Sequence, residues 1–182
     1  MKRIRWKIVV LGDGGVGKTT FLHRYINGSF LENTKLTIGV EFHTIFVEKD
    51  GNTVEFVLWD LGGQDRFRFF QENYIKGSRA AIIAFDMNRL STLAHVNDWV
   101  ALVREFATKD CPIILVGMKK DLIAEQHLSD IEEAAKEKME NLGLKEVQFT
   151  SSKENYNVKE TFDRLIDFIF DQIEEKKIGQ DN

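Results

Sequence analysis

Two kinds of apolar pattern follow one another along the chain. Short continuous apolar runs, which are typical of buried strands, alternate with longer segments whose apolar residues recur every three or four positions, as in amphipathic helices. The runs predict strands at residues 4–11, 40–48, 53–60, 80–85, 113–116 and 146–149. This alternation indicates an α/β fold, in which a mostly parallel sheet is covered by helices on both faces.

The ends of three predicted helices can be read from their capping residues. The first helix follows the first strand and ends at Gly28, because glycine readily adopts the left-handed conformation that closes a helix. A later helix begins with Ser129 and Glu132, which have capping-box spacing, and ends at Gly143. The last helix begins at Asn157.

Apolar stripes define where two of the helices should meet the sheet. The helix expected over about residues 92–107 has its stripe at Leu93, Val96, Val100, Val103 and Phe106. The last helix has its apolar positions at Val158, Phe162, Leu165, Ile166, Ile169 and Ile173. Faces of this kind bury themselves against a sheet, so we expect about five helices in a three-layer sandwich.

One pair of strands departs from the parallel pattern. Residues 40–48 and 53–60 flank Asp50-Gly51-Asn52, and a glycine turn of this length between two strands predicts a β-hairpin. We therefore expect a six-stranded sheet with one antiparallel edge strand. Residues 28–38, which precede the hairpin, are polar and without period, as in a segment of low local stability.

Composition limits the classes of protein that the chain can belong to. Its 182 residues, 43% of them hydrophobic, suit one domain, which we place at residues 1–178 with a short polar tail at 179–182. The net charge of −4 argues against nucleic acid as a partner. The single cysteine, Cys111, excludes a disulfide framework and fits the cytoplasm. No apolar run approaches the roughly 18 residues of a membrane span.

The most informative stretch is Gly12-Asp13-Gly14-Gly15-Val16-Gly17-Lys18-Thr19, followed by Thr20. It has the pattern G-x-x-x-x-G-K-T and lies between a predicted strand and a predicted helix, which is the context that a phosphate-binding loop requires. Glycines allow successive backbone N–H groups to point at phosphate oxygens. The Lys18 ammonium would reach the β- and γ-phosphates, and the Thr19 hydroxyl would bind Mg²⁺. The stretch predicts a nucleoside triphosphate site.

A second candidate element follows the third strand. Asp60, at the end of that strand, could hold Mg²⁺ through water. The backbone N–H of Gly63 could reach a γ-phosphate, and Gln64 could orient the water that attacks it.

Two further elements could distinguish guanine from adenine. Asp121 follows the fifth strand, and a carboxylate there can accept two hydrogen bonds from guanine N1 and its 2-amino group, a donor pair that adenine lacks. Backbone N–H groups of Ser151, Ser152 and Lys153, after the sixth strand, could bind guanine O6. Each element is weak alone, and its value lies in its position.

Together these residues resemble the Ras superfamily of small GTPases over residues 4 to about 175, and within it the Rab branch. The Rab-like stretches are Thr37-Ile38-Gly39-Val40-Glu41-Phe42, Arg66-Phe67-Arg68 and Tyr74-Ile75-Lys76-Gly77. The resemblance implies a P-loop NTPase fold and a GTP-hydrolysing switch with bound Mg²⁺ and GTP or GDP. Residues 28–38 and about 60–76 would be the two switch segments, which change conformation to control effector binding in membrane traffic or related regulation.

Individual roles follow from the same resemblance. Thr37 would bind Mg²⁺ and the γ-phosphate, beside Thr19 and Asp60 as the other metal-site residues. Phe30 would pack edge-on against guanine, and Lys119 would lie along the base plane. Lys18, Gly63 and Gln64 would form the catalytic set.

Partner contacts are also implied. Phe42, Trp59 and Tyr74 match the aromatic trio through which Rab proteins meet effectors, although their composition alone favours core positions. Exchange factors and GTPase-activating proteins would bind at the switches, and the chain would be a monomer. No arginine lies near Thr37 in sequence, the nearest cation being Lys35. Unaided hydrolysis should thus be slow, on the order of 10⁻⁴ to 10⁻³ s⁻¹, and an arginine in trans would accelerate it.

Several positions depart from the family pattern. Met118 stands where the family has an asparagine that bonds guanine N7 and ties the base loop to the phosphate loop. Methionine supplies no such donor, so we expect nucleotide binding weaker by about 1–3 kcal/mol and faster exchange. Thr34 replaces a tyrosine that closes over the phosphates, and Ser152 replaces an alanine. Gly62 replaces an alanine, and the resulting Gly-Gly-Gln is similar to the Arf and Gα branches.

The last residues lack the cysteine through which Rab proteins are lipidated, so we expect no lipid anchor in this chain. This fits either a shortened chain or a lineage without prenylation, such as a prokaryotic or archaeal Rab-like protein. Peripheral membrane association would then need a missing lipidated tail or a partner.

Two alternatives to a switch remain open at this point. One is a nucleotide-bound interaction module with little hydrolysis, for which Met118 is the main argument. The other is a P-loop kinase or ATPase, which would leave the pattern Lys119-x-Asp121 without a role.

The role of Gln64 leads to a first prediction. A Gln64→Leu variant loses the amide that would orient water, so single-turnover GTP hydrolysis should fall by about tenfold or more while GTP affinity stays unchanged. Hydrolysis at the parent rate would exclude this role.

Overall fold

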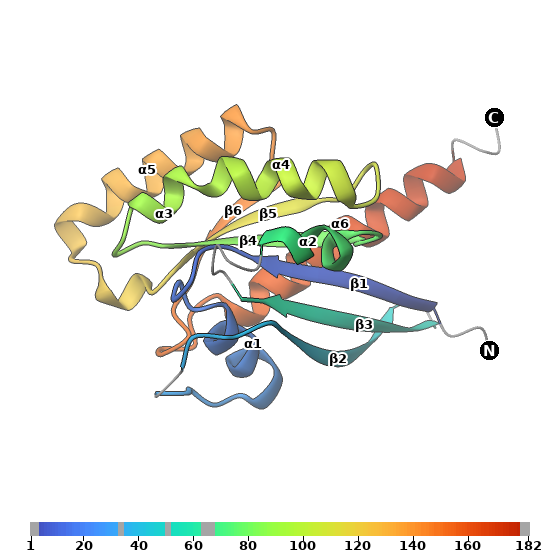
Figure 1. The fold of residues 1–182 in the computed structure, drawn as a ribbon, viewed down its shortest axis with the longest axis horizontal. Helices are drawn as coiled ribbons and strands as arrows, with labels where there is room; N and C mark the ends of the chain where they lie inside the picture. The colour runs from blue at the N-terminus through green and yellow to red at the C-terminus, as the bar shows by residue number, and fades with distance from the viewer. Residues whose placement is uncertain (1–3, 33–34, 50–51, 63–67, 179–182) are drawn as a thin grey trace.

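The structure is a computed structural model of the chain and describes residues 4–32, 35–49, 52–62 and 68–178 (Figure 1). In chain order the elements are β1 (Ile4–Leu11), α1 (Lys18–Asn27), β2 (Val40–Lys49), β3 (Asn52–Leu61), α2 (Arg68–Ile75), β4 (Ala80–Asp86), α3 (Ser91–Ala94), α4 (Val96–Phe106), β5 (Ile113–Met118), a 3₁₀ turn (Lys120–Leu122), α5 (Glu125–Asn141), β6 (Glu146–Phe149) and α6 (Val158–Ile178). None of the described helices combines the length and apolar character needed to cross a bilayer.

The six strands form one sheet in the order β2-β3-β1-β4-β5-β6. β2 pairs antiparallel with β3 at the edge, and the remaining pairs are parallel. The predicted six-stranded, mostly parallel sheet with one antiparallel edge strand is therefore confirmed.

Both faces of the sheet are covered, which explains why its central strands are continuously apolar. In β1, Ile8 and Val10 face a core that α1 and α6 complete, whereas Val9 and Leu11 face a second core beneath α2, α4 and α5. The two helical layers are visible on either side of the sheet in Figure 1. The three-layer sandwich is thus confirmed.

Two helices differ from their predicted bounds. The helix expected over 92–107 is divided at His95 into the short α3 and the longer α4. α5 begins at Glu125 rather than at Ser129, so the predicted capping box is wrong. Ser129 and Glu132 lie inside the helix, and the Glu132 carboxylate accepts a hydrogen bond from the Lys120 ammonium at 2.9 Å.

The parallel strands position the candidate site, since all five run in the same direction and their carboxyl ends meet at one edge of the sheet (Figure 1). The loop after β1, the end of β3 and the segments after β4, β5 and β6 therefore gather there, although they are as far apart in sequence as residues 12 and 153.

The core between the sheet and α6 yields a stability prediction. Phe162 is fully buried and stacks on Phe21 and Tyr25, with ring centroids 5.2 and 3.8 Å away. A Phe162→Ala variant should lower the free energy of unfolding by about 3–5 kcal/mol, because it leaves a cavity among large rings. Phe46→Ala is the matched control, since Phe46 is 61% exposed on β2 and its loss should cost less than about 0.5 kcal/mol. Urea titration of both variants would measure the difference, and equal midpoints would contradict it.

Candidate functional site

The loop between β1 and α1 requires glycine at several positions. Gly12, Gly15 and Gly17 have φ angles of 138, 74 and 110°, in the region that side chains other than glycine rarely adopt. A side chain at Gly12 would also begin 2.3 Å from the backbone oxygen of Ala84 in β4. The glycines of the predicted phosphate loop are thus needed for its path against the sheet.

Cationic side chains hold four consecutive carbonyl groups of this loop. The Lys18 ammonium donates to the carbonyls of Gly12 and Asp13, at 2.7 and 2.9 Å. The Arg89 guanidinium donates to the carbonyl of Gly14 at 2.7 Å, and the Lys119 ammonium donates to the carbonyl of Gly15 at 2.8 Å. A planar trans peptide directs its N–H opposite to its carbonyl, so these contacts fix where the N–H groups of the loop point.

Lys18 is nearly buried, and this burial makes its charged form less favourable than in water. Burial lowers its pKa to about 8, while the carboxylates of Asp60 and Asp13 act in the opposite direction and the Arg89 charge adds to the lowering. A phosphate group beside this ammonium would supply negative charge in a poorly solvated place, where charges interact strongly. Lys18 therefore suits an anion such as a nucleotide phosphate.

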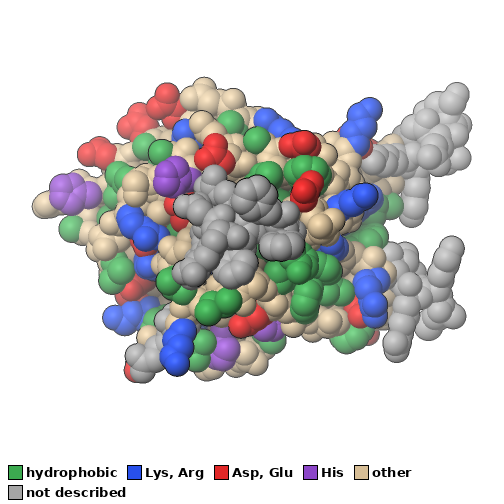
Figure 2. Space-filling model, viewed as in Figure 1, with side chains coloured by type: hydrophobic (Ala, Val, Ile, Leu, Met, Phe, Trp, Pro, Cys, Tyr) green, Lys and Arg blue, Asp and Glu red, His purple; other side chains and the backbone are tan. Residues whose placement is uncertain are grey.

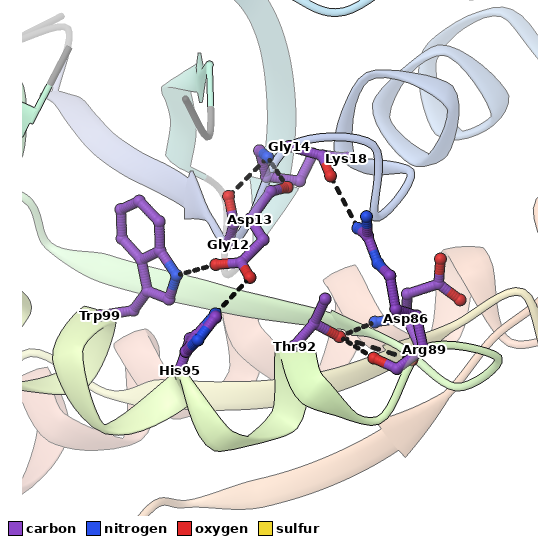
Figure 3. Close-up of polar contacts among 9 residues, drawn as sticks. All are labelled: Gly12, Asp13, Gly14, Lys18, Asp86, Arg89, Thr92, His95 and Trp99. Carbon is purple, nitrogen blue, oxygen red and sulfur yellow. Dashed lines mark hydrogen bonds and ion pairs between the residues drawn. The ribbon is translucent and has the colours of Figure 1, made fainter. Parts of the chain in front are cut away.

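The side chain of Asp13 is directed at α3 and α4. Its two carboxylate oxygens lie 2.6 Å from Nδ1 of His95 and 3.1 Å from Nε1 of Trp99 (Figure 3). Because this side chain is engaged with the helices, Asp13 has only its backbone groups for the predicted contribution to nucleotide binding. These contacts attach the phosphate loop to the helical layer above the sheet.

The three predicted metal-site residues meet in space. The hydroxyl oxygens of Thr19 and Thr37 lie 2.6 Å apart, and the Thr19 hydroxyl also donates to Oδ2 of Asp60. Thr19 begins α1, Asp60 ends β3, and Thr37 comes from the segment before β2. Two hydroxyls and a carboxylate are the oxygen ligands that Mg²⁺ prefers.

The other oxygen of Asp60 supports this fit. Oδ1 is buried and has no hydrogen-bond partner among the described residues. Burial raises the pKa of Asp60 above its ordinary value of 3.8, against the opposing effects of the Thr19 hydroxyl and the Lys18 charge. An unpaired buried carboxylate oxygen is costly unless a cation compensates it. Thr19, Thr37 and Asp60 thus fit a bound Mg²⁺, which would neutralise phosphate charge.

Gly62 is the point where the segment before β2 crosses the end of β3. Its N–H donates to the carbonyl of Gly39 at 2.9 Å. A side chain at Gly62 would begin 2.5 Å from the backbone oxygen of Thr37. The departure from the family alanine at this position therefore lets the two segments lie in direct contact.

The residues predicted to contact guanine lie together after β5 and β6. The hydroxyl of Ser151 donates to the carboxylate of Asp121 at 2.6 Å. Arg24 of α1 donates to the carbonyls of Ser152 and Lys153, at 2.6 and 3.0 Å. These bonds attach the loop after β6 both to the candidate base reader and to the helix of the phosphate loop.

A pocket at this edge collects much of the predicted site. Its lining includes Gly14, Gly15, Gly17, Lys18, Thr19, Thr20, Lys35, Leu36, Thr37 and Lys119. Gly12 and Val16 are buried beneath it, and Phe30 lies on the surface, 37% exposed. Gly63 and Gln64 lie outside the described residues, as do Thr34, Arg66 and Phe67.

The aromatic trio predicted for partner contact forms one cluster. The rings of Phe42 and Trp59 meet edge-on with centroids 4.5 Å apart, and Tyr74 lies 5.7 Å from Trp59. Phe42 is 53% exposed, so its composition-based assignment to the core is wrong. Figure 2 shows hydrophobic side chains gathered on this face over the region of β1, β3 and α2.

Sequence reasoning missed several residues that shape the site, namely Arg24, Asp86, Arg89, His95 and Trp99. Asp86 accepts a hydrogen bond from the Lys119 ammonium at 2.6 Å. No pattern marked them, because their partners in the candidate site lie between 33 and 129 positions away in the chain.

Fold and site together define a P-loop nucleotide-binding protein. A sequence profile of the Ras family matches residues 7–171, and the chain belongs to that family. It is 34% identical over 178 residues to the Ras-related protein YPTC6 of Chlamydomonas reinhardtii, covering 97% of this chain and 81% of that one. It is 35% identical to Rab-11C of Dictyostelium discoideum, covering 94% and 75%, and 36% identical to Rab-19 of Homo sapiens, covering 86% and 71%. The predicted Rab-like resemblance is thereby confirmed.

The buried carboxylate of Asp60 leads to a prediction about metal and pH. Because its pKa is raised on folding, the folded metal-free protein holds this proton longer than the unfolded chain, so stability falls as pH rises from about 3.8 through the raised pKa. An Asp60→Asn variant lacks the buried charge, and without metal it should be more stable at pH 7 by about 1–3 kcal/mol.

The same variant should lose the stabilisation that Mg²⁺ gives the parent. Thermal melts with nucleotide, in EDTA and in millimolar Mg²⁺, would measure both effects. Asp98→Asn is the control, since Asp98 is exposed on α4. A Mg²⁺-dependent rise in melting temperature as large in Asp60→Asn as in this control would disprove the metal role.

Proposed function

We propose that the chain is a GTP-driven switch, which binds guanine nucleotide with Mg²⁺ and hydrolyses GTP slowly. The observation that carries this proposal is the contact of Thr37 with Thr19 beside Asp60. It brings a residue of the first switch segment to the candidate metal site. Loss of a γ-phosphate and of its metal contacts would release Thr37, and with it the segment at about residues 28–38.

The second switch segment, at about residues 60–76, would respond to the same event. Near the start of this segment, the N–H of Gly62 donates to the carbonyl of Gly39 in the first segment. Movement of one segment would therefore alter a hydrogen bond that holds the other. Gly63 would donate its N–H to the γ-phosphate, and Gln64 would orient the attacking water. Lys18 would neutralise charge on the transferred phosphoryl group.

Guanine selection would rest on Asp121. The Ser151 hydroxyl holds its carboxylate in place, which reduces the entropy lost when a base binds. Adenine cannot offer the same pair of donors to this carboxylate, and a buried acceptor left unpaired is costly. Backbone groups at residues 151–153 would complete the contact with guanine.

The surface trio Phe42, Trp59 and Tyr74 would bind effectors, and the switches would bind exchange factors and GTPase-activating proteins. Two of the three rings belong to strands β2 and β3, which directly follow the first switch segment or lead into the second. Partners that contact this cluster could thus sense the nucleotide. A role in membrane traffic or related regulation is supported by the similarity to Rab-named proteins.

The experiment that tests this function is calorimetric titration of the chain with GTP, GDP and ATP, first with Mg²⁺ and then with EDTA. GTP and GDP should bind at least about 100-fold more tightly than ATP, because only guanine satisfies Asp121. EDTA should weaken GTP binding. Comparable affinity for ATP would refute guanine selection and favour a broader P-loop enzyme, whereas guanine binding without hydrolysis would favour a non-switching module.

A further inference from the structure

Arg89 contacts the phosphate loop from the turn between β4 and α3, a segment that sequence patterns did not connect with the site. Its guanidinium donates to the carbonyl of Gly14 at 2.7 Å (Figure 3). The same nitrogen lies 4.0 Å from where a side chain at Gly15 would begin. Its charge is also felt by Lys18, as one of the lesser influences on that ammonium after burial. Arg89 thus places a positive charge directly beside the phosphate loop.

The turn that carries Arg89 is firmly built. The backbone N–H of Arg89 donates to the carbonyl of Asp86 at 2.9 Å, and the carbonyl of Arg89 accepts a hydrogen bond from the Thr92 hydroxyl at 2.7 Å. The same hydroxyl accepts from the N–H of Asp86 at 2.9 Å, and Thr92 itself is buried. A backbone held in this way fixes where the exposed Arg89 side chain begins, within reach of the Gly14 carbonyl.

Met118, one of the departures from the family pattern, also contacts the phosphate loop. Met118 is buried, and its sulfur lies 3.6 Å from where a side chain at Gly17 would begin. It therefore packs against the phosphate loop from the base side but offers no strong hydrogen-bond donor. The phosphate loop has no polar connection to the side chain at position 118, whereas it has one to Arg89 at Gly14.

We infer that Arg89 is a positioning residue of the phosphate site, which compensates for the missing donor at position 118. By holding the Gly14 carbonyl, its guanidinium turns the N–H of Gly15, the other end of the same planar peptide, toward the nucleotide phosphates. Gly14 and Gly15 both line the pocket, so this peptide is well placed to bind an anion. The inference rests on the proposed function, because it assumes a nucleotide in that pocket.

The test is the dissociation rate of a fluorescent GDP in the presence of Mg²⁺, chased with unlabelled GDP. Arg89→Ala should release it about tenfold faster than the parent, because the Gly14–Gly15 peptide loses its anchor. Arg89→Lys retains one donor and should give an intermediate rate. Arg104→Ala is the matched control, since Arg104 also donates to a backbone carbonyl, that of Leu142, away from the site, and its rate should stay within about twofold.

A double-mutant cycle with Met118→Asn distinguishes compensation from a merely structural effect. With a donor restored at position 118, Arg89→Ala should raise the dissociation rate by less than about threefold. An equal effect of Arg89→Ala in both backgrounds, or a rate equal to that of the Arg104→Ala control, would overturn the inference. A drop in the melting temperature of the nucleotide-free protein that is specific to Arg89→Ala would also count against it.

This outcome can be separated from failure of the proposed function. If the parent holds ADP as tightly as GDP, guanine selection fails, but the same variants measured with fluorescent ADP still test Arg89. Arg89 acts on the phosphate loop, which either nucleotide would contact.

Discussion

The carbonyl groups of residues 12–15 each accept a hydrogen bond from an ammonium or guanidinium group, and the candidate phosphate site depends on this arrangement. Left to itself, a loop of glycines would sample many peptide orientations. Cations on one side fix the carbonyls, and peptide planarity then fixes the N–H groups on the other. The three cations come from α1, from the turn after β4 and from the end of β5. The loop is therefore shaped by three elements that meet only in the folded sheet.

The cluster of Thr19, Thr37 and Asp60 provides a second constraint, which concerns the segment before β2. Asp60 is buried at the end of β3 with one oxygen unpaired among the described residues, so it favours a cation nearby. Thr37 reaches this cluster only because the backbone passes close over Gly62. Packing at a single glycine thus lets the segment before β2 lie beside the candidate metal site.

Local sequence rules succeeded where one element contains the whole signal. The apolar runs identified every strand to within one or two residues, and Gly28 ended α1 as expected, with a φ angle of 68°. The same rules failed where a distant partner competed with a local one. Glu132 has the spacing of a capping box with Ser129, but α5 begins earlier, at Glu125, and the Glu132 carboxylate pairs with Lys120. Phe42 looked like a core residue, yet it lies on an edge strand and is 53% exposed.

The sequence by itself determined the fold class, because each element is encoded in a short run with its own period, and it predicted the phosphate loop from residue spacing. The other candidate nucleotide and metal residues were predicted from their places after strands and from the resemblance to small GTPases. It also identified Met118 as a departure, since that position is defined by its neighbours. Only the tertiary structure decided how the loop is held. Arg89, His95 and Trp99 act on residues 13 and 14 across more than 70 positions, and their positions follow from the pairing of β1 with β4. Contacts between residues so far apart in the chain produce no periodic sequence pattern, because any residue type with a suitable donor could occupy the position once the strands are paired.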